Sequence, residues 1–384
     1  MFKVKRIFVT GGKGFIGSHI VARLLEQDKN MEAYLLTRGS EEEANTKMQK
    51  IFSIIAPNLV NCQRFYMVNG DIVGTELGIK KNLPCFDEIW HLAAFLGFKQ
   101  SDHDTAYQAN VKGTENVLAF AKAQQAKKMH VMGTAFSRGK RQGLILENDQ
   151  YQEHGFNNPY EDTKYKARQI SLKWGKENNT PVFIYEPTIV TGDYFTGFAL
   201  NFKGYYTIAE NFVSFKQKAI KRLGNNDQRL RDWGVQYDGS YLTLPIRFFC
   251  KLNAPINLIP INFLVDIVSA IAKTERPGIY HIVNPNPPSF WFLFATSLDI
   301  LGIKGFTLVE TIPKDLTSLE RLINQANALY GGYFGTSQFF DYTNTASVLD
   351  CMPEMSITRI YLEKILGYAL ETDFGRSLGG GING

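Results

Sequence analysis

RIFVTGGKGFIGSHI, residues 6–20, contains the strongest structural signal in this 384-residue sequence. The β-branched run 7–10 predicts a buried strand, and apolar residues at helical spacing after it predict a helix. Between them Gly11, Gly14 and Gly17 recur every three residues. Backbone N–H groups in such a turn can close on a pyrophosphate, because no Cβ blocks the approach. The stretch predicts a dinucleotide-binding turn; an ordinary turn with incidental glycines is the alternative, which the later signals disfavour.

Strands and helices alternate from this stretch to Val190, which predicts an α/β fold with a doubly wound parallel (Rossmann) sheet. Strands are expected at 7–10, 32–39, 64–68, 86–94, 129–133, 181–185 and 278–283, and helices at 41–55, 106–124, 263–272 and from Asn158 onward. Residues 194–254 show no clear period, and helices are expected after Pro288. We therefore expect an NADP-binding domain of residues 1–193 plus 255–285. A smaller, mostly helical substrate lobe would comprise 194–254 plus 286–384.

The composition excludes several functional classes. A net charge of +5, without a Lys/Arg run interleaved with aromatics, argues against nucleic-acid binding. The four cysteines are scattered without metal-ligand spacing, so we expect reduced thiols, no metal site and a cytoplasmic location. The first expected strand leaves no room for a signal peptide, and no apolar segment is long enough to span a bilayer.

The residues after the second strand indicate the cofactor. A carboxylate there would bind a ribose 2′-hydroxyl, whereas an arginine can receive a 2′-phosphate. Arg38 stands there, followed by Ser40, which favours NADP over NAD. Lys13 in the glycine turn adds a second positive charge or is simply a solvated loop lysine.

Further candidates follow the third and fourth strands. Asp71 could accept a hydrogen bond from the adenine amino group while Ile72 packs on the ring; alternatively, Asp71 only caps a turn. Ala93 and Ala94 are small and leave room for a ligand at the carboxyl end of the sheet. His91 lies in an apolar run and is expected to be a core histidine.

Tyr160 and Lys164 are four residues apart on one predicted helix, so their side chains share a face. A neighbouring ammonium favours the phenolate, so we expect Lys164 to lower the pKa of Tyr160 towards neutrality. Thr134, at the end of the fifth strand, could hold the same substrate carbonyl. A surface Tyr–Lys pair is the alternative, but the glycine turn upstream favours hydride-transfer chemistry.

These motifs together resemble the extended short-chain dehydrogenases/reductases. The resemblance rests on TGGKGFIG (10–17), GDI (70–72), HLAA (91–94), NVKGT (110–114), Thr134 and NPYEDTK (158–164). It implies Thr134 as donor to the substrate oxygen, Tyr160 as acid/base and Lys164 as the residue that lowers its pKa and binds ribose. It also implies a supporting role for Asn110 in a proton-relay network.

Longer matches are similar to the thioester-reductase-like branch, which includes fatty acyl-CoA reductases and the reductase domains of carboxylic acid reductases. They are YLLTRG (34–39), GDIVGTELGI (70–79), NNPYEDTKYKA (157–167), PTIVTGDYFTG (187–197), IPINFLVDIV (259–268) and YHIVNPNP (280–287). The resemblance implies reduction of an acyl thioester by NADPH to an aldehyde, sometimes onward to an alcohol. Glu186 stands where the family usually has arginine.

The expected site is therefore an NADP site with a catalytic set of Thr134, Tyr160, Lys164 and Asn110. Cofactor contacts are expected from Gly11, Lys13, Gly14, Phe15, Ile16, Gly17, Arg38, Ser40, Asp71, Ile72, Leu92, Ala93, Ala94, Tyr160, Lys164, Pro187, Thr188 and Ile189. The expected partner is a small-molecule or carrier-bound acyl substrate. The basic residues between Lys216 and Arg231 would dock an acyl carrier protein supplied in trans, or form a solvated helix face. Monomer and homodimer both stay open.

Two alternatives to thioester reduction remain. The chain could reduce or epimerise a ketone, sterol or nucleotide sugar. It could also be a catalytically idle NADP-binding sensor, which Glu186 favours and the intact Thr134, Tyr160 and Lys164 disfavour.

Overall fold

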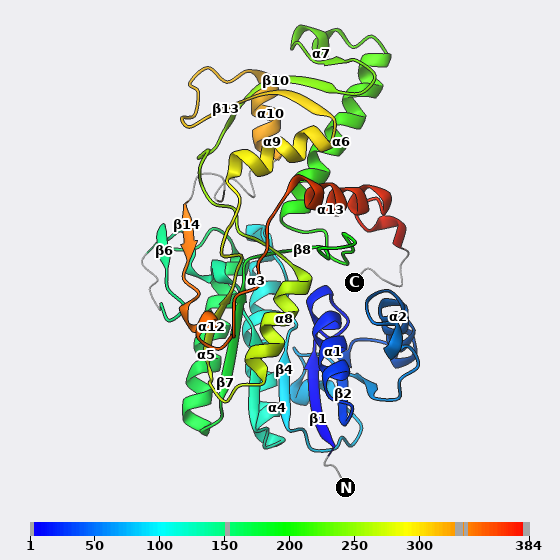
Figure 1. Cartoon of the computed structure of the whole chain (residues 1–384), viewed down its shortest axis with the longest axis vertical. Coiled ribbons are helices and arrows are strands. Elements are labelled where there is room, and N and C mark those ends of the chain that lie inside the picture. The colour runs from blue at the N-terminus through cyan, green and yellow to red at the C-terminus, as the bar shows by residue number, and fades with distance from the viewer. Residues whose placement is uncertain (1–3, 150–153, 327–332, 334–336, 379–384) are drawn as a thin grey trace.

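The main sheet has seven parallel strands in the order β12-β7-β5-β4-β1-β2-β3. The structure is a computed structural model that describes residues 4–149, 154–326, 333 and 337–378 (Figure 1). The strands are β1 (Lys5–Thr10), β2 (Met31–Thr37), β3 (Phe65–Asn69), β4 (Glu88–His91), β5 (Lys128–Met132), β7 (Val182–Pro187) and β12 (Gly278–Ile282). The predicted doubly wound parallel sheet is confirmed.

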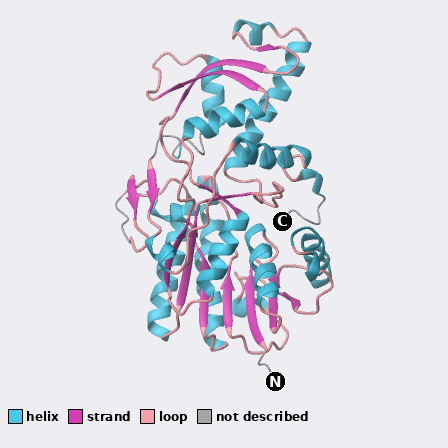
Figure 2. Cartoon of the chain, in the orientation of Figure 1, coloured by secondary structure: helices cyan, strands magenta, loops and turns pink. Residues whose placement is uncertain are grey.

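Apolar residues alternate along the strands because successive side chains point to opposite faces. Ile7 and Val9 of β1 belong to one hydrophobic cluster and Phe8 to another. Helices α1 (Phe15–Gln27), α2 (Glu41–Ile55) and α8 (Ile261–Ala272) cover the first face, and α4 (Gly113–Ala123) and α5 (Pro159–Asn178) cover the second (Figure 2). The sheet is thus sandwiched between helices, and its ligand-binding edge lies at the carboxyl ends of the strands.

The helix expected over 106–124 is continuous but changes its winding. α3 (His103–Ala106) passes into a π-helical turn (Tyr107–Lys112), which leads into α4. Such π turns are rare and appear mostly at functional sites. Here the turn contains Asn110.

A second sheet lies beyond the carboxyl ends of the main strands (Figure 1). β10 (Leu242–Phe249) pairs parallel with β13 (Ile303–Val309) and antiparallel with β9 (Gln236–Tyr237). The helices of this region are α6 (Tyr205–Gly224), α7 (Gln228–Asp232), α9 (Phe290–Ile300), α10 (Ser318–Ala326) and α13 (Arg359–Glu371). The statement that 194–254 has no period was wrong for β10, whose residues alternate between buried and more exposed. The prediction of helices after Pro288, together with the stretch 339–342, did not include β13.

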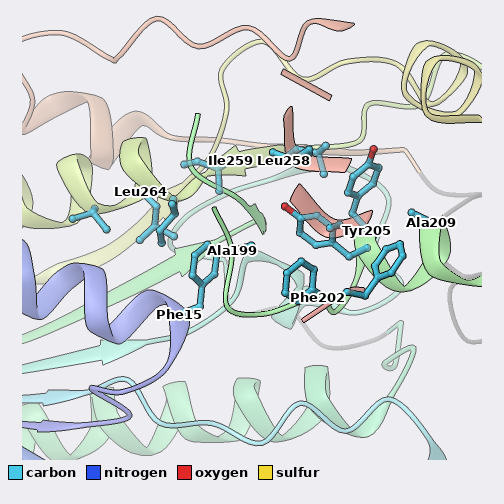
Figure 3. Packing of buried hydrophobic residues seen from close by; sticks show 14 of the residues in the cluster. Phe15, Ala199, Phe202, Tyr205, Ala209, Leu258, Ile259 and Leu264 are labelled. Atoms are coloured by element: carbon cyan, nitrogen blue, oxygen red, sulfur yellow. The ribbon is translucent and has the colours of Figure 1, made fainter. Parts of the chain in front are cut away.

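One hydrophobic cluster runs from the main sheet into this region. Phe15 at the start of α1 and Leu264 of α8 join Ala199, Phe202 and Tyr205 in it (Figure 3). The second region is therefore packed onto the sheet through continuous apolar contact.

Short strands complete the junction. β8 (Ile189–Thr191) pairs with β11 (Leu258–Pro260), and β6 (Gly143–Ile145) pairs with β14 (Gln338–Phe340). α12 (Thr343–Ser347) packs against β12. The division into 1–193 plus 255–285 and 194–254 plus 286–384 stays a prediction.

None of the helices described has both the length and the apolar character needed to cross a membrane. The described part of the chain also contains no cluster of three or more metal-ligating side chains.

Candidate functional site

The glycine turn brings the end of β1, the end of β4 and the start of α1 together. Gly11 has a φ of +73°, and a Cβ on it would lie 2.6 Å from the Ala93 nitrogen. A Cβ on Gly17 would lie 2.1 Å from the Gly11 carbonyl oxygen. Gly14 is the N-cap of α1, and no side chain among the described residues caps this helix. Its first N–H groups and its dipole therefore favour an anion at the turn.

The other predicted cofactor contacts also follow main-sheet strands or lie beside them. Four strands are each followed by some of them: β1 by Lys13, Phe15 and Ile16, β2 by Arg38 and Ser40, β3 by Asp71 and Ile72, and β4 by Leu92, Ala93 and Ala94. Pro187 ends β7, and Thr188 and Ile189 come after it. Tyr160 and Lys164 lie on α5. The sheet order thus places all of them along one edge.

Three cations gather beside the glycine turn. Burial, with the charge of Arg38, lowers the pKa of Lys13. Burial, with the charge of Lys13, lowers the pKa of Lys47 on α2. Lys13 is partly buried, and Arg38 is exposed at the end of β2. Mutual repulsion of this kind marks a site that an anion would stabilise.

Several residues of this edge have structural contacts. Ser40 caps α2 by accepting a hydrogen bond from the Glu43 nitrogen (3.3 Å). The Asp71 carboxylate accepts one from the Val73 nitrogen (3.2 Å), which is the turn-capping contact that the sequence left open. His91 is buried between the hydroxyls of Thr10 (2.7 Å) and Thr114 (3.0 Å), so its prediction as a core histidine is confirmed.

Thr134, Tyr160 and Lys164 meet at the end of β5. The Thr134 hydroxyl donates to the Pro187 carbonyl oxygen at 3.5 Å, and Thr134 is among the groups that lower the pKa of Tyr160. The Lys164 ammonium donates to the Met132 carbonyl oxygen at 2.5 Å. The tyrosine ring lies 5.8 Å from that of Phe98, in the loop that follows β4. The structure therefore brings together the three side chains that the sequence singled out.

The protonation of the pair differs from the expectation. Burial raises the pKa of Tyr160 to about 12, and the neighbouring Thr134 side chain opposes this only in part. Burial lowers the pKa of Lys164 to about 8, against the attraction of Glu186. The expectation that Lys164 lowers the pKa of Tyr160 towards neutrality was wrong for this structure. Desolvation of the phenolate dominates, and the Lys164 ammonium, which donates to the Met132 carbonyl oxygen of β5, is not among the groups that shift Tyr160.

Asn110 ties the loop after β4 to α5. Its amide nitrogen donates to the Phe95 carbonyl oxygen and to the Thr163 hydroxyl, both at 3.0 Å. Its oxygen accepts from the Phe95 nitrogen at 2.7 Å. Asn110 thus links Phe95, in the loop after β4, to Thr163, which lies three residues after Tyr160 on α5. The role of Asn110 in a proton relay stays a prediction.

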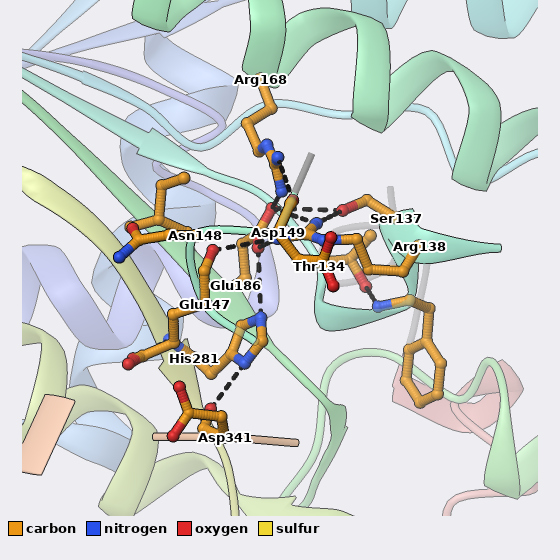
Figure 4. A network of polar contacts seen from close by, with 12 residues as sticks. Thr134, Ser137, Arg138, Glu147, Asn148, Asp149, Arg168, Glu186, His281 and Asp341 are labelled. Atoms are coloured by element: carbon orange, nitrogen blue, oxygen red, sulfur yellow. Dashed lines mark hydrogen bonds and ion pairs between the residues drawn. The ribbon is translucent and has the colours of Figure 1, made fainter. Parts of the chain in front are cut away.

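A buried ionic network behind Thr134 was missed from the sequence (Figure 4). Glu186 of β7 is 0% exposed and pairs with Arg138 at 3.0 Å and Arg168 at 3.6 Å. It also accepts from Ser137 at 3.2 Å and lies 3.5 Å from His281. The two arginines and His281 hold the pKa of Glu186 far below its usual range. The only sequence signal was the unusual Glu186, because its partners come from separate elements.

Several basic residues of α6 and α7 make contacts within the chain. Lys216 donates to the Leu301 carbonyl oxygen at 2.9 Å, and Arg222 pairs with Asp227 at 2.7 Å. The carrier-docking role of this region stays a prediction.

Comparisons with known proteins now become informative. Residues 9–268, more than half of the chain, match the family described as male sterility protein. The aldehyde reductase lnaA of Aspergillus flavus is 26% identical over 91% of this chain and 34% of its own length. Fatty acyl-CoA reductase 1 of Xenopus laevis is 25% identical over 68% of this chain and 58% of its own length. The chain thus spans about a third of the first relative and less than two thirds of the second.

The fold has close solved counterparts. The terminal R domain of the myxalamid PKS-NRPS pathway superposes with a TM-score of 0.74 at 18% identity, covering 97% of this chain and 92% of that one. A thiolation-reductase di-domain from an archaeal non-ribosomal peptide synthetase gives 0.68 at 18% identity, with 97% and 76% covered. The chain belongs to the male sterility protein family, within the thioester-reductase-like branch of the extended short-chain dehydrogenases/reductases.

Proposed function

We propose that the protein is an NADPH-dependent reductase of acyl thioesters, bound to CoA or to a carrier protein, or of the derived aldehyde. The observation that carries the proposal is the meeting of Thr134, Tyr160 and Lys164 beside the glycine turn. A carbonyl held there would lie between hydrogen-bond donors and the cofactor edge of the sheet.

The glycine turn and the cation group support NADP as the cofactor. The close approaches at Gly11 and Gly17 leave a cradle without Cβ atoms, which fits a pyrophosphate at the N-terminus of α1. Arg38, Lys13 and Lys47 lie near the end of β2, where a 2′-phosphate would relieve their mutual repulsion. When bound, NADPH supplies the hydride that the protein itself lacks.

Tyr160 would donate the proton and Thr134 would orient the substrate oxygen. With a pKa of about 12, Tyr160 is protonated at neutral pH, which suits the reductive direction. The two hydroxyls stabilise the negative charge that develops on the carbonyl oxygen. For a thioester, the product of hydride and proton addition is a hemithioacetal, which breaks its C–S bond to release aldehyde and thiol.

The choice of substrate rests on the relatives. Two relatives are named as an aldehyde reductase and a fatty acyl-CoA reductase, and the two solved counterparts belong to a PKS-NRPS pathway and a non-ribosomal peptide synthetase. We infer the same substrate class for this chain.

The test is loss of NADPH absorbance with acyl-CoAs, acyl-loaded carrier proteins, aldehydes and nucleotide sugars as separate substrates. Turnover of thioesters or aldehydes, with NADPH preferred over NADH, is expected. Turnover of nucleotide sugars alone, or tight NADPH binding without turnover of any substrate, would overturn the proposal in favour of an epimerase or a sensor.

A further inference from the structure

The end of β5 is contacted from two sides by groups of opposite charge. The Lys164 ammonium from α5 donates to the Met132 carbonyl oxygen. On the next residue, a Cβ at Gly133 would lie only 2.9 Å from the Glu186 Cγ. Lys164 and Glu186 therefore both approach residues 132–133, directly before Thr134.

Glu186 also holds the turn that follows Thr134. Its Oε1 accepts from the Ser137 hydroxyl at 3.2 Å, and its Oε2 lies 3.0 Å from the Arg138 guanidinium. Thr134 is the N-cap of this short helix, Ala135–Arg138, and accepts from the Phe136 nitrogen at 3.4 Å. The position of the Thr134 hydroxyl is thus linked through one helical turn to the buried carboxylate.

The charges around Glu186 are organised so that its carboxylate stays ionised. Arg138 and Arg168 are 2% and 1% exposed. Both arginines also donate to backbone carbonyl oxygens, Arg138 to Glu147 at 3.1 Å and Arg168 to Asp149 at 2.6 Å. A carboxylate buried without such partners would be neutralised, and removing it leaves two buried cations facing one another.

We propose that Glu186 is a positioning residue whose single buried carboxylate fixes the turn that carries Thr134 and faces the ammonium of Lys164 across the end of β5. The catalytic part of this inference rests on the function proposed above. The electrostatic part concerns the folded chain alone.

The groups that face Lys164 come from three elements. Glu186 of β7 stabilises its charged form, and the Lys164 charge in turn disfavours protonation of His91 on β4. Tyr160 and Arg168 lie one turn away on either side in α5, and Tyr160 stays neutral at a pKa of about 12. Glu186 is therefore the anion on which the charge of Lys164 depends.

The experiment is a pH titration of Lys164 by NMR in protein labelled with ¹³C at lysine Cε, with the signal assigned by Lys164→Arg. Glu186→Gln removes the charge and keeps the shape, so the midpoint of Lys164 should fall by about 1 pH unit. Glu186→Asp keeps the charge, and its midpoint should stay near that of the wild type. Glu88→Gln, which removes a buried carboxylate at the other end of the sheet, serves as the matched control.

An unchanged midpoint in Glu186→Gln, or an equal fall in Glu88→Gln, would overturn the inference. If Glu186→Gln alone does not fold, combining it with Arg168→Met removes one cation together with the anion. The same fall is then expected, because Arg168 is not among the groups that shift Lys164.

Activity adds the catalytic half of the test. For any substrate that is turned over, Glu186→Gln should lower kcat at neutral pH, leave KM for NADPH unchanged and move the alkaline limb of the kcat profile to lower pH. If the alkaline limb of the kcat profile stays at the same pH in Glu186→Gln, the inference is contradicted. Failure of all substrates would count against the proposed function only, since the NMR midpoints are measured without substrate.

Discussion

In the proposed reaction Tyr160 and Lys164 have separate tasks, because burial raises the pKa of the phenol and lowers that of the ammonium. The phenol keeps its proton, with a pKa of about 12, whereas the ammonium has a pKa of about 8 and titrates close to working pH. The tyrosine is thus a ready proton donor, and the lysine controls whether the site carries a positive charge.

Replacing the donor tests the first task. Tyr160→Phe keeps the ring and removes the proton, so we expect kcat to fall roughly 10²–10⁴-fold with little change in NADPH affinity. Tyr165→Phe, on the same helix, is the matched control, because its ring contact with Arg168 is retained. Comparable activity of both variants would contradict the role of Tyr160.

The pH profile tests the second task. Lys164 is charged below a pH of about 8 and loses its proton above it, so kcat should decline as pH rises through that value. Lys164→Arg keeps a positive charge at all accessible pH values, and in a folded variant the limb near pH 8 should disappear. A wild-type profile that stays flat through this range would refute the assignment.

The proposed preference for NADP rests on Arg38 after β2 and on Lys13 in the glycine turn. Arg38→Ala, alone or with Lys13→Ala, should raise KM for NADPH roughly 10–100-fold, since charge-assisted hydrogen bonds to a phosphate are lost. KM for NADH should not change. Lys50→Ala, an exposed lysine on the helix that carries Lys47, is the control. An equal rise in KM for NADPH and for NADH would mean that Arg38 does not bind the 2′-phosphate.

The junction of β1 and α1 depends on a backbone approach that only glycine allows. A Cβ at Gly17 would lie 2.1 Å from the Gly11 oxygen, so Gly17→Ala must push the helix away from the turn. We expect loss of NADPH binding, measured by fluorescence titration, and destabilisation by about 1–3 kcal/mol.

Gly367→Ala is the matched control for this junction. Gly367 lies within α13, and no atom lies within 4 Å of its added Cβ. It should stabilise the fold by about 0.5–1 kcal/mol and leave binding intact. If Gly17→Ala binds NADPH as well as the wild type does, α1 can move away from the glycine turn without loss of the site, which would contradict this prediction.

Elements whose residues follow one simple period could be predicted from the sequence. The seven main strands and the glycine turn came from local apolar runs and small residues, which burial in a parallel sheet explains. β10 was missed although its even-numbered residues are buried in alternation, because Pro245 within it is atypical of a strand interior. Ion pairs between residues far apart in the chain could not be predicted, because no local sequence pattern relates Arg138 or Arg168 to Glu186.

At the scale of the whole molecule, the stability of the fold depends on pH through the partly buried His19 and the buried His91. Burial lowers the pKa of His19 to about 4 and that of His91 to about 3, against about 6.5 in an unfolded chain. The unfolded state therefore binds more protons as pH falls below about 6.5.

The free energy of unfolding should thus fall with decreasing pH, by about 1.4 kcal/mol per pH unit for each histidine between its two pKa values. Urea unfolding at a series of pH values measures this slope. His91→Asn should reduce it, whereas His103→Gln, at a 42% exposed side chain, should not. Stability that is constant from about pH 6.5 to about pH 5 would contradict this account.

The order of the main sheet also has a consequence for synthesis. β7 pairs with β5 on one side and with β12 on the other, yet residues 188–277 separate β7 from β12 in the chain. Until β12 leaves the ribosome, nascent β7 presents a bare row of peptide groups, which is a template for aggregation. Truncated translation products that end before residue 278 are therefore expected to accumulate as insoluble material or to depend on chaperones.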